Sequence, residues 1–139
     1  MGYQIEPVEI GADSPIRYRF GLVRLDEKAT ILMVTFDGTA GEAEPRLMSA
    51  VVNFGVSFVE PRGVVLDLRG LSYAGGDRMS ATLDAARRRG RAVVVVSDLC
   101  RAAITSLVEA ELMARPEEWV FDDPDRAIDA VAETVRRRS

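Results

Sequence analysis

The sequence predicts an α/β domain built on a mainly parallel sheet. Short apolar runs that are typical of buried strands alternate with longer segments of helical periodicity. Only a short polar turn separates the first two strand-like runs, which predicts an antiparallel hairpin at the start of the sheet. The chain has 139 residues, 47% of them hydrophobic, which is enough for one core and short for two. We therefore expect residues 1–139 to form a single domain with four to five strands and helices packed against the sheet.

The N-terminal part of the chain predicts an arm followed by a hairpin. Residues 1–14 show no sustained pattern, which favours an extended arm or a short edge strand. Apolar and polar residues alternate over residues 16–25, and the alternation shifts near Gly21, so we expect a half-exposed strand with a bulge there. After the polar turn at residues 26–28, residues 29–36 are apolar on both faces, as in an interior strand.

The middle of the chain predicts two helices around a second interior strand. Pro45 stands at a tolerated first-turn position of a helix, and Gly55 is expected to end that helix as its C-cap. Residues 64–68 form the next apolar run. A helical pattern follows Asp77 and stops at Gly90.

The last third of the chain continues the alternation. Residues 91–96 predict a third buried strand, and residues 97–98 are expected to cap the helix that follows it. A brief strand at residues 119–121 precedes a helix that begins at Asp123 and Pro124. The order is β-β-α-β-α-β-α-β-α, which implies right-handed crossovers between parallel strands.

Composition excludes several classes of function. The chain has no histidine, which removes Ser-His-Asp and Cys-His catalysis and the commonest metal ligand, so we expect no metal, no cofactor and no enzymatic activity. Cys100 is the only cysteine and is expected to be a small buried side chain. The net charge of −4 argues against a nucleic-acid partner. With no apolar run near ~20 residues and no basic leader, we expect a cytoplasmic protein without a membrane partner.

Charged clusters have an ordinary structural interpretation. The arginines at 87–91 and 136–138 lie at the ends of predicted helices, where cations complement the helix dipole. Acidic pairs lie at predicted helix starts or in loops, where capping is expected. Asp67 is different, because a carboxylate inside an apolar strand must find a partner or face a crevice.

The loop after residues 64–68 is the candidate site. In open α/β sheets, ligands and regulatory groups gather beyond the carboxyl ends of the strands. Its glycines could expose backbone N–H groups to an anion or a partner; equally, they could serve a tight turn that Asp77 caps. The candidate residues are Ser72, Tyr73, Gly75, Gly76, Asp77, Arg78 and Ser80.

These segments resemble the STAS family, which includes the bacterial anti-sigma factor antagonists. The family has a strand of the form VVLDL, a short turn, and an Asp-Ser-Ser-Gly loop that opens a helix. The chain has VVLDL at residues 64–68, a similar turn at residues 70–73, and Gly-Gly-Asp-Arg at residues 75–78 in place of the family loop. Residues 120–128 of the chain are also similar to the end of the family's domain, where a short strand precedes a helix. The resemblance extends over roughly residues 16–135.

The resemblance implies a non-enzymatic protein-binding module in bacterial regulatory signalling. The implied partner is a regulatory protein such as an anti-sigma factor or a kinase, and a homodimer is a further possibility. In the family a loop serine or threonine is phosphorylated, but residues 75–77 carry no hydroxyl. Ser72 and Ser80 flank the loop and could act as displaced phosphorylation sites. The alternative is a small-ligand or anion-binding domain, or an enzyme, that uses the Gly75–Gly76 turn.

Overall fold

The computed structural model describes residues 2–7, 15–41, 44–75 and 78–138. The element order agrees with the expected alternation, with one short helix added before the last strand. The elements are β1 (Ile16–Arg24), β2 (Thr30–Thr39), α1 (Glu44–Val59), β3 (Gly63–Ser72), α2 (Met79–Arg87), β4 (Arg91–Val95), α3 (Arg101–Ala110), α4 (Pro116–Trp119), β5 (Val120–Phe121) and α5 (Pro124–Arg137).

Within the described residues, the strands form one five-stranded sheet in the order β1-β2-β3-β4-β5. β1 and β2 are an antiparallel hairpin, and the remaining neighbours pair in parallel, as the sequence predicts. The bulge expected near Gly21 is wrong, because β1 pairs with β2 in one continuous register from Ile16 to Arg24. The irregularity lies instead between β2 and β3, where the register shifts between Thr35 and Asp37.

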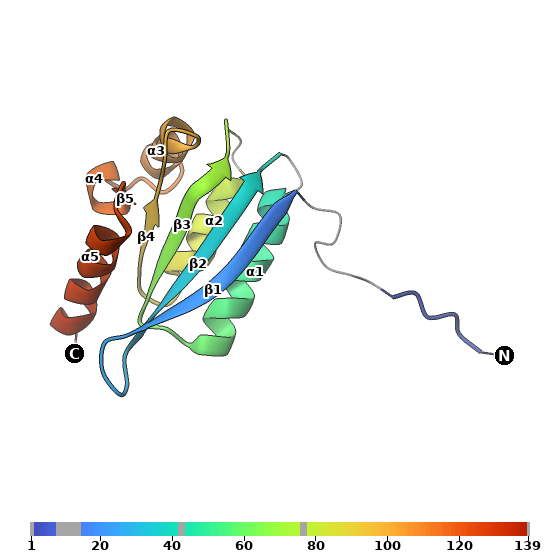
Figure 1. The fold of residues 1–139 in the computed structure, drawn as a ribbon, viewed down its shortest axis with the longest axis horizontal. Coiled ribbons are helices and arrows are strands. Elements are labelled where there is room, and N and C mark those ends of the chain that lie inside the picture. The colour runs from blue at the N-terminus through green and yellow to red at the C-terminus, as the bar shows by residue number, and fades with distance from the viewer. Residues whose placement is uncertain (1, 8–14, 42–43, 76–77, 139) are drawn as a thin grey trace.

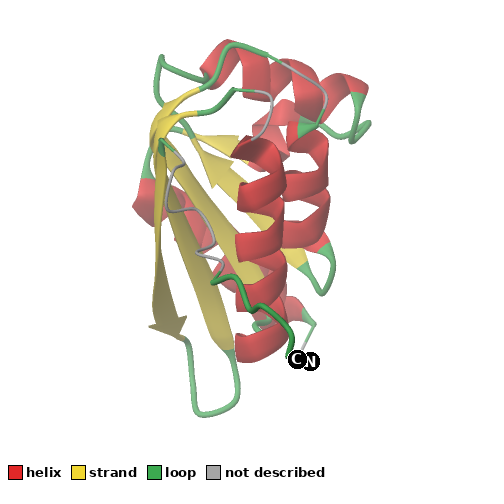
Figure 2. Cartoon of the chain, turned by 90° about the vertical axis from the view of Figure 1, so that its right-hand side faces the viewer, coloured by secondary structure: helices red, strands yellow, loops and turns green. Residues whose placement is uncertain are grey.

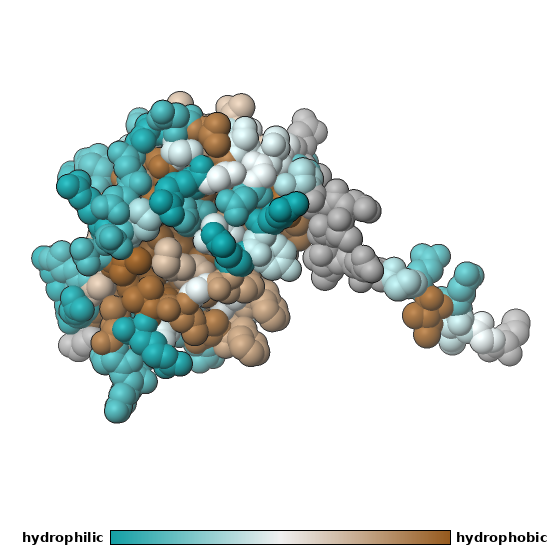
Figure 3. Space-filling view, viewed as in Figure 1, coloured by the Kyte–Doolittle hydropathy of each residue, from teal (hydrophilic) through white to brown (hydrophobic). Residues whose placement is uncertain are grey.

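Helices cover both faces of the sheet, so the fold has three layers (Figures 1 and 2). Leu32, Val34 and Phe36 of β2 face α1 and α2 in the larger core, whereas Ile31 faces the smaller core under α5. This alternation explains why the β2 segment is apolar on both faces. Figure 3 shows apolar side chains at the surface beside α5, where partly buried residues of β1, β2 and α5 border the smaller core.

Gly55 does not end the first helix, contrary to the sequence prediction. α1 continues to Val59, and Gly55 is buried inside it. A Cβ at this position would lie 2.7 Å from Cε1 of Phe20 and 3.0 Å from Cδ2 of Leu32. The glycine therefore lets the helix pack closely against β1 and β2.

β1 is more exposed than its alternation suggests. Ile16 is buried, but the next apolar residues on the same face, Tyr18, Phe20 and Leu22, are 45%, 41% and 50% exposed. β1 is an outer strand of the described sheet, and α1 covers its inner side incompletely. An aromatic surface is left along this edge.

Two helix starts differ in how well the sequence predicted them. Asp123 caps α5 as expected, because its side chain accepts a hydrogen bond from the backbone N–H of Asp125 at 3.0 Å. The expected cap of α3 at residues 97–98 is wrong: a turn intervenes, and Cys100 is the N-cap residue. Ser97 stabilises that turn instead, since its carbonyl accepts the N–H groups of Cys100 and Arg101.

The arginine clusters lie where the helix-dipole argument places them. Arg87 is in the last turn of α2, and Arg136 and Arg137 are in the last turn of α5. Within the described residues, no helix combines the length and apolar character that crossing a bilayer requires.

Candidate functional site

The loop after β3 begins at the edge of the sheet where β2, β3 and β4 end. Ser72, the last residue of β3, pairs with Thr39 of β2. The N–H of Ala40 donates to the Ser72 carbonyl at 2.9 Å, and the N–H of Tyr73 donates to the Leu99 carbonyl at 3.2 Å. The beginning of the loop, at Ser72 and Tyr73, is therefore held between the end of β2 and the turn that precedes α3.

The structure divides the candidate loop residues between the interior and the surface. Tyr73 is buried and belongs to the core, while Ser72 and Ser80 are half-buried. Gly75 and Arg78 are exposed. Gly75 has a φ of +151°, in the range that favours glycine, so the turn requires its conformational freedom.

Gly76 and Asp77 lie outside the described residues. The proposed capping of α2 by Asp77 and the anion site on the Gly75–Gly76 turn therefore stay predictions. The displaced phosphorylation sites at Ser72 and Ser80 stay predictions as well.

α2, the helix that follows the loop, is joined to the start of α1 by a buried hydrogen bond. The Thr82 hydroxyl, fully buried, donates to the Pro45 carbonyl at the start of α1 at 3.2 Å. Met79 and Leu83 of the same helix are also fully buried. α1 and α2 are therefore held together and pack against the same face of the sheet.

A shallow groove of about 400 Å³ separates the loop from α3. Ala102, Ser106 and Ala110 are exposed and stand four residues apart, so they share one side of α3. Ala74 and Gly75 form the opposite wall. Leu99 in the adjoining turn is 58% exposed, although it is a large apolar residue. We call Ala74, Gly75, Leu99, Ala102, Ser106 and Ala110 the loop–α3 surface.

The α3 side of this surface was missed at the sequence level. The sequence pattern predicts a helix after residues 97–98 and indicates no function for its outer side. The spacing of Ala102, Ser106 and Ala110 was the available signal, because small exposed residues at i, i+4 and i+8 let another backbone approach a helix closely. The adjacency to the loop was not readable, because it depends on the order of the strands.

Asp67 has found a partner on its own strand. One carboxylate oxygen accepts the Arg69 Nε–H at 2.9 Å and the Arg69 backbone N–H at 3.2 Å. The other accepts Arg69 Nη2–H at 2.8 Å. Leu66 and Leu68, on the opposite side of β3, belong to the larger core. Asp67 is thus a buried carboxylate paired with Arg69, which is the first of the two outcomes that the sequence predicts for it.

Two opposing effects act on the Asp67 carboxyl. Burial raises the pKa of Asp67, but the hydrogen bonds from Arg69 and the charges of Arg69 and Arg19 outweigh it and lower the pKa below its ordinary value. A carboxyl with a lowered folded-state pKa stabilises the fold above its unfolded pKa, and that contribution is lost as the pH falls through the folded pKa.

Asp67→Asn is therefore expected to reduce stability at neutral pH and to weaken the acid dependence of unfolding below about pH 4. Arg69→Met should weaken the same dependence, because it removes the group that lowers the pKa. Urea unfolding at several pH values measures both effects. An acid dependence identical in the wild type and both variants would contradict this role of the pair.

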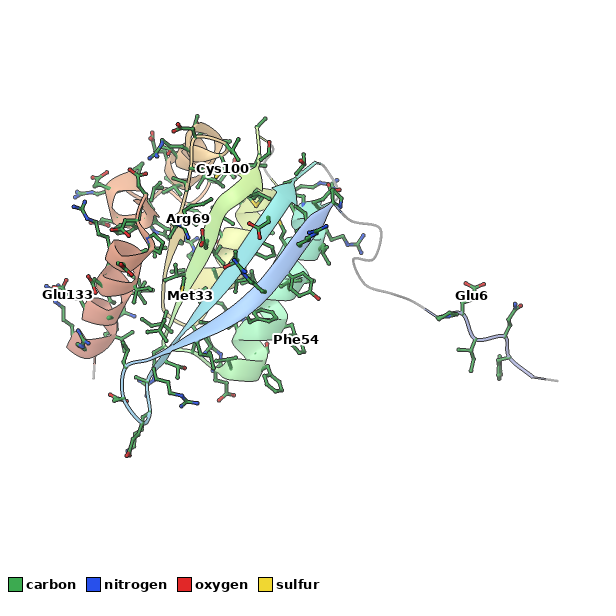
Figure 4. All side chains as sticks on the ribbon, viewed as in Figure 1. Glu6, Met33, Phe54, Arg69, Cys100 and Glu133 are labelled. Atoms are coloured by element: carbon green, nitrogen blue, oxygen red, sulfur yellow. The ribbon has the colours of Figure 1, made fainter. Side chains whose placement is uncertain are left out.

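Cys100 has the structural role that its isolation in the sequence predicts. It is 2% exposed, and its Sγ–H donates to the Leu68 carbonyl at 3.3 Å. Burial raises the pKa of the thiol, which disfavours the thiolate. Figure 4 places Cys100 at the end of the sheet where the candidate loop lies.

The groove beside α3 is lined mainly by small side chains. Among the residues the structure describes, no group of three or more acidic, cysteine or histidine side chains could hold a metal ion. The described groove lining includes the carboxylate of Glu111 and no arginine or lysine, which disfavours an anionic ligand in the groove. Most of the described lining residues are small, and the exposed side chain of Leu99 belongs to the adjoining turn.

Comparisons with known proteins bear on the fold. No model of a known protein family matches the sequence, and no curated protein matches it. Among solved structures, the chain is similar to an anti-sigma factor antagonist from Mycobacterium paratuberculosis, with a TM-score of 0.57 and 15% sequence identity. The match covers 83% of this chain and 94% of that chain. The likeness is therefore one of fold, and this chain has the STAS-like fold of an anti-sigma factor antagonist.

Proposed function

We propose that this chain is a non-enzymatic protein-binding module of bacterial regulatory signalling that binds a regulatory protein such as an anti-sigma factor or a kinase. The observation that carries the proposal is the loop–α3 surface, which is exposed and rich in small residues. It lies at the carboxyl edge of the sheet in a STAS-like fold.

The shape of this surface suits a helix or a loop of a partner protein. Ala102, Ser106 and Ala110 present little side chain, so a partner backbone can approach α3 closely. Leu99 offers an exposed apolar side chain that a partner pocket can bury. The hydrogen bonds at Ala40 and Tyr73 hold the neighbouring backbone in place, which lowers the ordering cost of binding.

We infer that the exposed part of the loop lacks a phosphorylation switch. Between Ser72 and Ser80, Tyr73 is the only residue with a hydroxyl, and its side chain is buried. Residues 74–79 therefore offer no hydroxyl whose phosphorylation could add charge and release the partner. If Ser72 and Ser80 do not take over that role, binding is set by the concentration of the partner. Ser72 and Ser80 remain the positions where a displaced switch would act.

The test is affinity capture from a lysate of the organism that encodes the chain, with bound proteins identified by mass spectrometry. Ser106→Arg places a long charged side chain in the groove at an exposed helix position. We expect it to weaken binding of a captured regulatory protein by at least about tenfold, which corresponds to about 1.4 kcal/mol. Ser57→Arg is the matched control, because Ser57 is an exposed serine of α1 outside the groove.

The comparison of the two variants decides the outcome. Retention by the wild type and Ser57→Arg, with loss from Ser106→Arg, supports the proposal. Equal retention by both variants moves the contact away from the loop–α3 surface. If neither a regulatory protein nor any other protein is specifically retained by the wild type, the proposal fails.

A further inference from the structure

The exposed apolar side chains of the described residues are concentrated in two places. One is the edge formed by β1 and α1, with Tyr18, Phe20, Leu22, Phe54 and Phe58. The other is the N-terminal arm, residues 2–7, where Tyr3 and Ile5 are 99% and 88% exposed. Leu99 of the loop–α3 surface and Met113 are the remaining large ones described as exposed.

The edge of the sheet carries a continuous row of aromatic rings. Tyr18 and Phe20 meet edge to face with ring centroids 6.0 Å apart, and Phe20 lies 6.4 Å from Phe54. Phe54 stacks on Phe58 at 5.8 Å. A groove of about 280 Å³ runs between the strand and the helix, lined by Tyr18, Phe20, Leu47, Ala50, Val51 and Phe54. An aromatic patch of this kind marks an interaction surface.

β1 is also an outer strand of the sheet, with β2 as its neighbour on one side. Backbone N–H and C=O groups along the other side of an outer strand can pair with a further strand. The two faces of β1 differ in character. Tyr18, Phe20 and Leu22 point toward the groove side, and Arg17 and Arg19 lie on the opposite face.

The N-terminal arm matches both faces of β1 at once. Its sequence from residue 2 is GYQIEP, so Tyr3 and Ile5 share one side of an extended strand, and Gln4 and Glu6 share the other. An arm paired with β1 puts its apolar side over the aromatic groove and Glu6 on the side of the arginines. The charges are complementary, because β1 contains three arginines and no acidic residue.

The structure shows the arm extended away from its own domain (Figures 1 and 3). Figure 4 places Phe54 on the outer side of α1, on the side of the molecule toward which Glu6 and the arm project. The arm and the groove are thus both exposed in a single chain. If two copies exchange arms, each arm covers the groove of the other copy. A two-fold symmetric exchange of this kind leaves no arm free to bind a third copy.

We propose that the N-terminal arm of one copy pairs with the outer edge of β1 in a second copy, so that two chains form an arm-exchanged dimer. Tyr3 and Ile5 contact the groove between β1 and α1, and Glu6 faces Arg17 and Arg19. This surface is separate from the loop–α3 surface. Dimer formation and partner binding can therefore be tested independently.

Sedimentation velocity of the full chain over roughly a hundredfold range of concentration tests the proposal, because dimer formation depends on concentration. The wild type is expected to form a dimer. The double variant Tyr3→Asp/Ile5→Asp should weaken the dimer at least about tenfold, since it removes two buried apolar contacts per arm. Gln4→Asp is the matched control. It adds a carboxylate on the arginine side and should leave the dimer unchanged or tighter.

A mixing experiment distinguishes exchange from an arm that folds back on its own chain. Phe54→Asp changes the groove at a side chain that is 63% exposed, so the fold is retained, as circular dichroism can verify. Mixed with the arm double variant, it should form a heterodimer, because an intact arm meets an intact groove in that pair alone. A monomeric wild type, a dimer unaffected by the arm variant, or a mixture without heterodimer would each overturn the proposal.

Discussion

Truncation of Phe36 to alanine is expected to lower the free energy of unfolding by about 3–5 kcal/mol. Phe36 is fully buried and lies in the larger core between the sheet and α1 and α2. Removing its ring loses apolar burial and leaves a cavity under β2. The end of β2 pairs with the end of β3, where the candidate loop begins. A loss of this size is a large part of the stability of an ordinary domain.

Chemical unfolding monitored by circular dichroism measures this effect. Phe58→Ala is the matched control, because Phe58 is 78% exposed, and its truncation should change stability by no more than about 0.5 kcal/mol. Similar losses for the two variants would show that the larger core is not where the structure puts it.

Gly63→Ala is expected to destabilise the fold by about 1–3 kcal/mol through overpacking. A Cβ on Gly63 would lie 2.2 Å from Cγ1 of Val131 in α5 and 3.2 Å from the Arg91 carbonyl. The strand would have to move away from the helix that covers the smaller core. This position therefore depends on close approach between β3 and α5.

A second substitution isolates the cause. Gly63→Ala combined with Val131→Ala should cost less than the sum of the single changes, because the colliding methyl is gone. Gly21→Ala, whose nearest contact would be Met33 Cβ at 3.8 Å, serves as the control in β1. Additive losses in the double variant would mean that the collision is not responsible.

Much of the fold was predictable because the sequence pattern and the burial coincide. β2, β3 and β4 are apolar on both faces, and the structure buries both faces under helices. Asp123 followed by Pro124 marked the start of α5 through local capping chemistry alone. These elements needed no knowledge of distant neighbours.

The errors concern positions that distant contacts decide. Glycine is common at helix ends, which is why Gly55 predicted one. In the structure Gly55 lies inside α1, where the Phe20 ring of β1 leaves no room for a Cβ. The alternation of β1 predicted a half-exposed strand, but its apolar face is also partly exposed, with Tyr18 and Phe20 at 45% and 41%. The sequence predicted a loop between the third strand and the helix that follows it, and the structure has β3 end at Ser72 and α2 begin at Met79. The contact of this loop with the outer side of α3 arises from tertiary structure and could not be predicted from local pattern.

The central claim is that a regulatory protein binds at the loop–α3 surface. Amide hydrogen exchange of the chain with and without the captured partner tests it most directly. We expect added protection at Ala74 and Gly75 and along α3 from Arg101 to Ala110, with α5 unchanged. Protection confined to α5 or to the β1 edge, with the loop and α3 exchanging as in the free chain, would contradict it.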